Sequence, residues 1–182
     1  MKQKLMTYLF VVSLFGFLGA PQVRSDSAAE IDAEVQATLA HFYRHVGGSS
    51  DLVGRAAGVL VFPNVVRAGM GVGGEYGEGA LQIRGKPEGY YNTVSLSIGF
   101  QLGVEKRSVI IAFMTDDALA KFRRAHGWSI GVDGSVTLIT IGVGGSIDTS
   151  QVNSPVIGFI FDEKGLMYNL TLEGTKISPI RR

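Results

Sequence analysis

Hydrophobic positions near the start of the chain follow a helical period. Apolar residues recur at intervals of three and four, at Ile31, Val35, Leu39, Phe42 and Val46. That spacing places them on one face of a helix. Ser27 and Glu30 precede the stripe with the spacing of a capping box, in which each residue caps a backbone N–H of the other. We therefore expect a helix over 27–46, ended by two glycines, and a short second helix from a Ser50 cap to Arg55.

From Gly58 onward the period changes to that of strands. Residues 59–62 are a short apolar run that Pro63 closes. Six apolar residues then alternate strictly with small or polar ones, at Val94, Leu96, Ile98, Phe100, Leu102 and Val104. A strict period of two predicts a one-sided strand, whose small face lies against another layer or against water.

Further strands are expected over 108–114, 136–143, 156–161 and 166–172, the last after a turn at 162–165. Between the first two of these, Thr115 and two aspartates cap a helix whose Leu119 and Phe122 face inward. The predicted fold class is α+β. It has an N-terminal helix pair, then a mostly antiparallel, Gly-rich sheet (a sandwich or partial barrel) with one inserted helix near 115–126.

Glycine makes up 25 of the 182 residues, about twice its usual share. The stretch 69–74 matches the dinucleotide-binding fingerprint, but that motif needs a helix to follow, and here the glycines run on to 79 and into a strand. We interpret them as sheet glycines that permit close backbone packing or bulges.

The first residues resemble an export signal. Lys2 and Lys4 precede an uncharged apolar run over 5–20, which is short for a membrane span of about 20 residues. We predict a signal peptide over 1–25, cleaved after Ser25, and a single domain over 26–182. An uncleaved N-terminal anchor is the alternative. Both place the domain outside the cytoplasm, periplasmic or secreted, and without cysteine it is not a lipoprotein.

Charge and chemistry exclude several function classes. Of 17 Lys and Arg and 16 Asp and Glu, the signal holds Lys2, Lys4 and Arg24, so 17 − 3 leaves 14 basic against 16 acidic residues. A nucleic-acid-binding domain is expected to be clearly basic, so we expect no nucleic-acid partner. His41 and His45 lack the acids that would complete a metal site. No catalytic constellation emerges, so neither an enzyme nor a cofactor is expected.

Two basic clusters remain as candidate sites. They are Lys106 with Arg107, and Lys121 with Arg123 and Arg124 on the mid-chain helix. Such charges are either solvated surface or, together, a site for anionic headgroups, because arginine binds phosphate with two hydrogen bonds.

Several segments resemble the SYLF domain family. They are Val-Leu-Val-Phe-Pro at 59–63, Gly-Met-Gly-Val-Gly-Gly-Glu-Tyr-Gly-Glu-Gly at 69–79, and the runs at 89–92, 113–116, 131–135, 165–167 and 172–177. Eukaryotic members of that family resemble phosphoinositide-binding modules, some of which bind or bundle actin, and bacterial members are exported. The resemblance therefore implies binding of an anionic phospholipid membrane. Actin is not expected as a partner of an exported bacterial protein.

The family also associates membrane contact with an N-terminal amphipathic helix, which makes Ile31, Val35, Leu39 and Phe42 a possible membrane-facing stripe. A membrane-surface helix is expected to carry a basic polar face. This one is acidic in its first half, which favours a core position for the stripe. The leading functional hypothesis is an exported lipid-binding module. The alternative is a non-enzymatic envelope protein that self-associates through its sheet as a homo-oligomer.

Overall fold

A computed structural model describes residues 26–140, 145, 147, 153–164 and 172–182. The predicted signal at 1–25, the strand predicted over 166–172 except for its final residue, and residues 141–143 of another lie outside the described residues. No helix in the described part of the chain is long and apolar enough to cross a membrane.

Three helices form where the sequence predicts them. The first, α2 (Ala28–His45), begins with the expected capping box, in which Glu30 N–H donates to the Ser27 hydroxyl and Ser27 N–H donates to the Glu30 carboxylate. The second, α3 (Ser49–Arg55), has Gly48 as its N-cap and so starts two residues earlier than a Ser50 cap would allow; Ser49 is buried and its hydroxyl donates to the Val46 carbonyl oxygen at 2.6 Å. The inserted helix is α4 (Asp116–Arg124), capped by the Thr115 hydroxyl.

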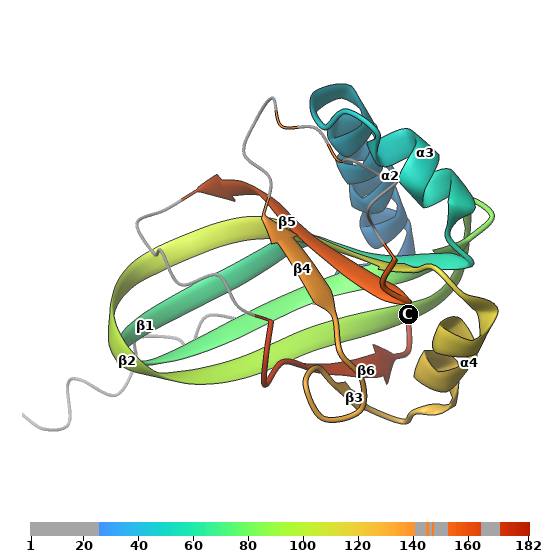
Figure 1. Ribbon diagram of the computed structural model, residues 1–182. Helices are drawn as coiled ribbons and strands as arrows, with labels where there is room; N and C mark the ends of the chain where they lie inside the picture. The colour runs from blue at the N-terminus through green and yellow to red at the C-terminus, as the bar shows by residue number, and fades with distance from the viewer. Residues whose placement is uncertain (1–25, 141–144, 146, 148–152, 165–171) are drawn as a thin grey trace, which may run out of the picture.

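The sheet is built on one long hairpin of β1 (Gly58–Ile83) and β2 (Lys86–Phe113). The other elements are β3 (Trp128–Ser129), β4 (Thr137–Thr140), β5 (Val156–Lys164) and β6 (Lys176–Ile180). Strands β5 and β6 pair with different parts of β2, β3 pairs with β6, and β4 lies parallel to β5. The result is a mostly antiparallel sheet curled into a half-barrel (Figure 1), which confirms the predicted α+β class.

Several predicted strand boundaries were wrong. Pro63 does not end a strand, because a register shift between Phe62 and Val65 accommodates its missing N–H, and β1 continues for twenty residues. Its carbonyl oxygen accepts a hydrogen bond from the Ser108 hydroxyl at 2.8 Å. Residues 162–164 continue β5 instead of turning. The short strands β3 and β6 were not predicted.

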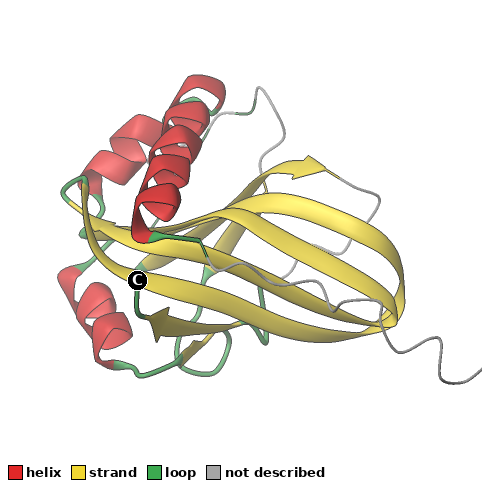
Figure 2. Cartoon of the chain, turned by 180° about the vertical axis from the view of Figure 1, so that it is seen from behind, coloured by secondary structure: helices red, strands yellow, loops and turns green. Residues whose placement is uncertain are grey.

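The glycine-rich segment is strand, which confirms the sheet interpretation of 69–79. Two of its glycines let β1 fold back against itself. A Cβ atom added to Gly79 would lie 2.0 Å from the carbonyl oxygen of Val61, and one added to Gly77 would lie 3.1 Å from that of Asn64. Only a residue without a side chain fits at Gly79. Seen from both sides, the bent end of the hairpin projects away from the helices (Figures 1 and 2).

The core lies on both faces of the sheet. On one face, α2 and α3 bury their apolar sides against β1, β2 and β5. On the other, Phe122 of α4 packs against Phe113 and Trp128, with ring centroids 4.8 and 5.6 Å away. The α2 stripe is part of the first core, with Ile31, Val35, Leu39 and Phe42 all buried. The stripe therefore faces the sheet and not a membrane.

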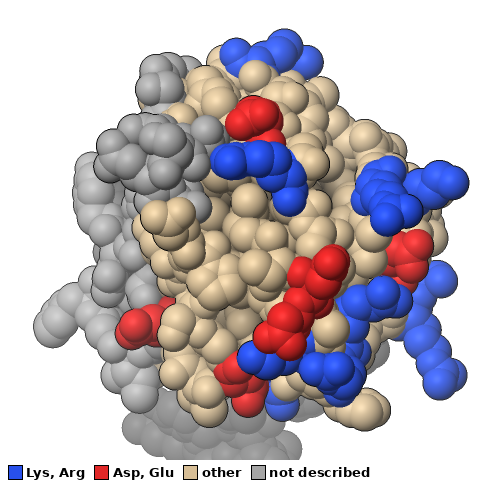
Figure 3. All heavy atoms as spheres, turned by 45° about the vertical axis from the view of Figure 1, so that its right-hand side comes forward, with Lys and Arg blue, Asp and Glu red and all other residues tan. Residues whose placement is uncertain are grey.

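Charged side chains on the surface are mixed in sign. On the face that Figure 3 turns forward, Lys and Arg side chains lie interleaved with Asp and Glu, not in one continuous basic field. Such an arrangement gives little long-range attraction for an anionic partner.

Candidate functional site: an apolar groove at the bent end of the sheet

The bent half of the β1–β2 hairpin, which carries residues 66–76 and 94–107, exposes apolar side chains and buries charged ones. Leu96, Val104 and Val72 are 84%, 66% and 65% exposed, and Val66, Tyr76 and Val94 are also exposed. The alternation predicted for 94–104 is present, but at its described positions the apolar face turns outward. Exposed large hydrophobic side chains that share one region mark an interaction surface more often than scattered ones do.

Four charged residues fill the interior behind this surface. They are Arg67, Glu75, Glu105 and Arg107, all at least 96% buried. The Arg107 guanidinium donates to Glu75 at 2.7 Å and lies 3.6 Å from a Glu105 oxygen, while Arg67 Nε lies 4.0 Å from Glu75. Two cations and two anions compensate one another, as buried charges must.

Glu75 shows how far this interior is removed from water. Burial raises the pKa of its carboxyl group, and the neighbouring Arg107 and Arg67 only partly oppose that rise. Because the inside of the bent end is polar, the apolar side chains of the same strands have no core to enter and remain outside.

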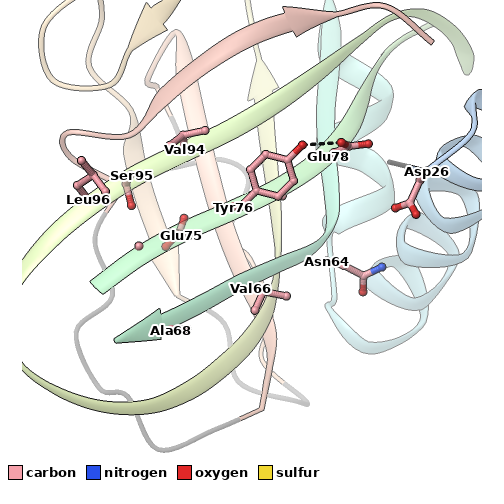
Figure 4. Close-up of a pocket in the computed structure, with 12 residues that line it drawn as sticks. Asp26, Asn64, Val66, Ala68, Glu75, Tyr76, Glu78, Val94, Ser95 and Leu96 are labelled. Atoms are coloured by element: carbon pink, nitrogen blue, oxygen red, sulfur yellow. Dashed lines mark hydrogen bonds between the residues drawn. The ribbon is translucent and has the colours of Figure 1, made fainter. Parts of the chain in front are cut away.

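An open groove of about 540 Å³ is lined by four of these exposed residues, Val66, Tyr76, Val94 and Leu96. Figure 4 shows how its walls are formed, with Val66 and Ala68 on one segment of β1, Tyr76 on the next, and Val94 and Leu96 on β2. Lys106 is exposed on the same outer face, where the register pairs it with Val66. The groove therefore has a mostly apolar lining, which also includes the carboxylates of Asp26, Glu75 and Glu78, and Lys106 lies on the same outer face.

A hydrogen-bonded network lies at one end of the groove. The Tyr76 hydroxyl donates to Glu78 (Figure 4), and the Arg182 guanidinium donates to both Glu78 oxygens. Burial and the adjacent Glu78 raise the pKa of Tyr76 to about 12. Although burial raises the pKa of Glu78, hydrogen bonds from Arg182 and Tyr76 outweigh it and hold that pKa below its ordinary value. These hydrogen bonds hold the Tyr76 side chain in place as one wall of the groove.

Comparison with known proteins bears on the family. A family model described as Ysc84, Las17-binding protein actin regulator, matches residues 94–181, from the middle of β2 through α4 to β6. This model is the SYLF domain. Over residues 94–181, the match confirms the similarity to the SYLF family. No curated protein matches the chain.

The fold does not gather the five predicted basic residues into one site. Arg107 lies in the interior with Glu75, so its prediction as a headgroup contact was wrong: its charge is already paired and away from the surface. Lys106 is separated from the end of β2, after which α4 begins, by seven residues, about 23 Å of strand.

The remaining three basic residues lie together on α4. Lys121 is 2.9 Å from Asp117, and Arg123 is 3.9 Å from Glu88, both as exposed ion pairs. In the described part of the chain, no group of three His, Cys, Asp or Glu side chains could hold a metal ion.

Sequence reasoning missed the groove, although the chain contained a signal for it. Glu105 and Arg107 have the same parity as the small residues that alternate with Val94 and Leu96, so strand geometry places these charges on the face opposite the valines and leucine. When one face of a strand carries charges and the other carries apolar groups, the sequence pattern alone does not decide which face lies inside. At Glu105 and Arg107 this face lines the interior, where the two side chains lie with the oppositely charged Arg67 and Glu75.

Proposed function

We propose that this domain is an exported lipid-binding module that contacts anionic phospholipid membranes through the apolar surface of its bent end. The observation that carries the proposal is the outward-facing apolar side of the bent half of the β1–β2 hairpin, which exposes Leu96, Val104 and Val72 beside the groove. Similarity to the SYLF family supports a lipid as the partner. The bent end projects away from the helices (Figure 1), so the helices would not stand between it and a flat surface.

The magnitudes favour reversible, peripheral binding. Full burial of a Val or Leu side chain contributes about 1.5–3 kcal/mol, so three of them supply several kcal/mol before the loss of freedom on association is subtracted. Lys106 adds about 1 kcal/mol near an anionic surface. Binding should therefore depend on lipid charge only modestly and survive moderate salt.

Vesicle co-sedimentation tests this proposal. We expect Leu96→Asp combined with Val104→Asp to weaken binding to anionic phospholipid vesicles by about tenfold or more, because each charge would have to enter the apolar boundary. Val132→Asp is the matched control, since Val132 is 83% exposed but lies outside the β1–β2 hairpin. Equal binding by the double variant and the wild type would refute the bent end as the contact.

The α4 residues are tested in the same assay. The headgroup contact predicted for Lys121, Arg123 and Arg124 stays a prediction. Helix α4, which carries them, lies away from the bent end (Figure 1). If they meet the membrane, replacing Arg123 and Arg124 by Gln weakens binding about tenfold and reduces its salt dependence. Loss of binding here, with the Leu96 variant unaffected, would put α4 at the membrane instead.

Self-association through the sheet is the second candidate, because the same exposed apolar surface could meet another copy. It predicts a stable oligomer by analytical ultracentrifugation that Leu96→Asp dissociates, together with no vesicle binding by the wild type.

Export is part of the proposal as well. N-terminal sequencing of the mature protein should begin within residues 26–30, and an intact Met1 in a cytoplasmic fraction would contradict it.

A further inference from the structure

A second hollow lies under the helix pair, away from the groove. It has a volume of about 430 Å³, is partly open to solvent, and is bordered by α2, α3 and both ends of β1. Leu39, Val53 and Val59 supply apolar walls. The volume lies within the usual range for small-molecule sites, which are mostly apolar with a few placed polar groups.

Gln82 is a buried polar residue that lines this hollow, together with the hydroxyl-bearing Tyr43 and Ser50. Its side chain is 4% exposed, lines the hollow, and makes no hydrogen bond through either amide atom to any part of the chain that the structure describes. A buried amide without partners costs about 1–3 kcal/mol, so such groups are rare and require an explanation. Both a donor and an acceptor are therefore available to a ligand.

Arg84 supplies a positive charge at the same place. It is the one charged residue among the described side chains that line the hollow. Its backbone is left-handed, with φ 51°, and so is that of Gly85, with φ 74°. Together they form the two-residue hairpin turn that normally prefers Asn-Gly. Strained backbone at a non-glycine residue is found preferentially at functional sites.

We infer that this hollow binds the oxyanion head and adjoining chain of a single-chain anionic amphiphile, such as a fatty acid or a lysophospholipid. The head accepts hydrogen bonds from Gln82 Nε2 and the Arg84 guanidinium, and the chain covers the apolar walls. The site shares no lining residue with the groove, so this inference does not rest on the proposed membrane contact.

Binding is measured on the mature chain by isothermal titration and by the NMR signal of the Gln82 side-chain amide. The probes are dodecanoate and dodecyl phosphate, below their micelle concentrations, with dodecanol and inorganic phosphate for comparison. We expect both amphiphilic anions to bind and to shift the Gln82 amide signal. The tighter of the two identifies the head as carboxylate or phosphate. The neutral alcohol and the free phosphate should bind at least about tenfold more weakly.

Two variants test the site without unfolding the protein. Gln82→Leu removes the unpaired amide and should melt no lower than the wild type, while weakening probe binding by about tenfold. Gly54→Leu should have the same effect on binding, because a Cβ at this helical position meets nothing within 4 Å and the side chain can occupy the hollow. Arg55→Gln is the control, an exposed arginine of α3 that does not line the site.

Three outcomes would overturn the inference. One is unchanged probe binding by Gln82→Leu and Gly54→Leu. Another is dodecanol binding as tightly as the anions, which would remove the oxyanion from the argument. The third is no binding of any probe and no shift of the Gln82 signal, which would mean that water alone satisfies the amide. Vesicle binding should be unchanged in Gln82→Leu, so failure here is distinguishable from failure of the membrane proposal.

Discussion

At the scale of single residues, Arg107 and Lys106 show how one position along a strand separates two environments. The side chain of Arg107 is buried beside Glu75 and Glu105, whereas that of its neighbour is exposed on the outer face. Basic residues adjacent in the sequence resemble one surface cluster, but alternation sends them to opposite faces. The same substitution should therefore lower stability strongly at Arg107 and hardly at all at Lys106.

We expect Arg107→Met to lower the free energy of unfolding by about 3–5 kcal/mol, because it leaves Glu75 and Glu105 buried without their partner. Adding Glu75→Gln should restore part of that loss. Lys106→Met, at the exposed neighbour, should change stability by no more than about 0.5 kcal/mol. Urea unfolding of the four proteins measures this, and a mild effect of Arg107→Met would refute a compensated buried cluster.

The raised pKa of Tyr76 gives a pH prediction. Its folded-state pKa of about 12 exceeds the ordinary value of about 10. The protonated hydroxyl is therefore favoured by folding, so its contribution to stability is complete below pH 10 and is lost as the pH rises from about 10 to about 12. Tyr76→Phe should show a shallower fall in melting temperature over that window. A fall equally steep in both proteins would contradict the assignment.

Arg84 gives a prediction about strain. Arg84→Asn should stabilise the protein by up to about 1 kcal/mol, because Asn tolerates the left-handed conformation that the turn imposes. If the guanidinium also holds an anion, the same variant should bind dodecyl phosphate less tightly. Thermal melts with and without the probe separate the two effects, and a destabilised variant would show that Arg84 is not strained.

At the scale of elements, the length of β1 depends on residues that sequence rules treat as strand breakers. Pro63 sits at a bulge and the glycines at a close crossing, so both occur within a strand of 26 residues. Local pattern predicted the helices well, because caps and a 3.6-residue period are encoded within each segment. It could not predict the crossing of β1 on itself, β3 or β6, because partners distant in the chain determine them.

Gly79 and Gly74 test that crossing. Gly79→Ala should destabilise the protein severely or prevent folding, since its Cβ would fall 2.0 Å from the Val61 carbonyl oxygen. Gly74→Ala in the same strand should be tolerated, because the nearest atom to its Cβ would be 3.9 Å away. Circular dichroism melts compare the two. Equal tolerance would mean that the two halves of β1 are not in backbone contact.

At the scale of the whole molecule, the two proposed binding regions lie in different environments. One is an open groove on the outer face of the bent end, and the other is a less open hollow beside the helix pair. Composition and charge could exclude classes of function but could not indicate these places, because each depends on which face of a strand is inner. The family resemblance added the class of partner and could not add the surface.

The two regions should act independently. Leu96→Asp with Val104→Asp should leave dodecyl phosphate binding within about twofold of the wild type, since sites with no shared partners are usually additive. The reverse should hold for Gln82→Leu and vesicles. Titrations and co-sedimentation on all three proteins measure this, and a parallel loss of both activities in either variant would indicate one shared site.

The tight turn at Arg84–Gly85 also has a consequence for how the chain reaches its fold. Register partners in the hairpin run from Ile83 with Lys86, three residues apart, to Gly58 with Phe113, fifty-five apart. Each pair formed brings the next into reach, so the loop that must close at every step stays short and its entropy loss small. The hairpin can therefore form by successive pairing outward from its turn. Strands β5 and β6 pair with β2 and can dock only after it has formed, which makes them later additions.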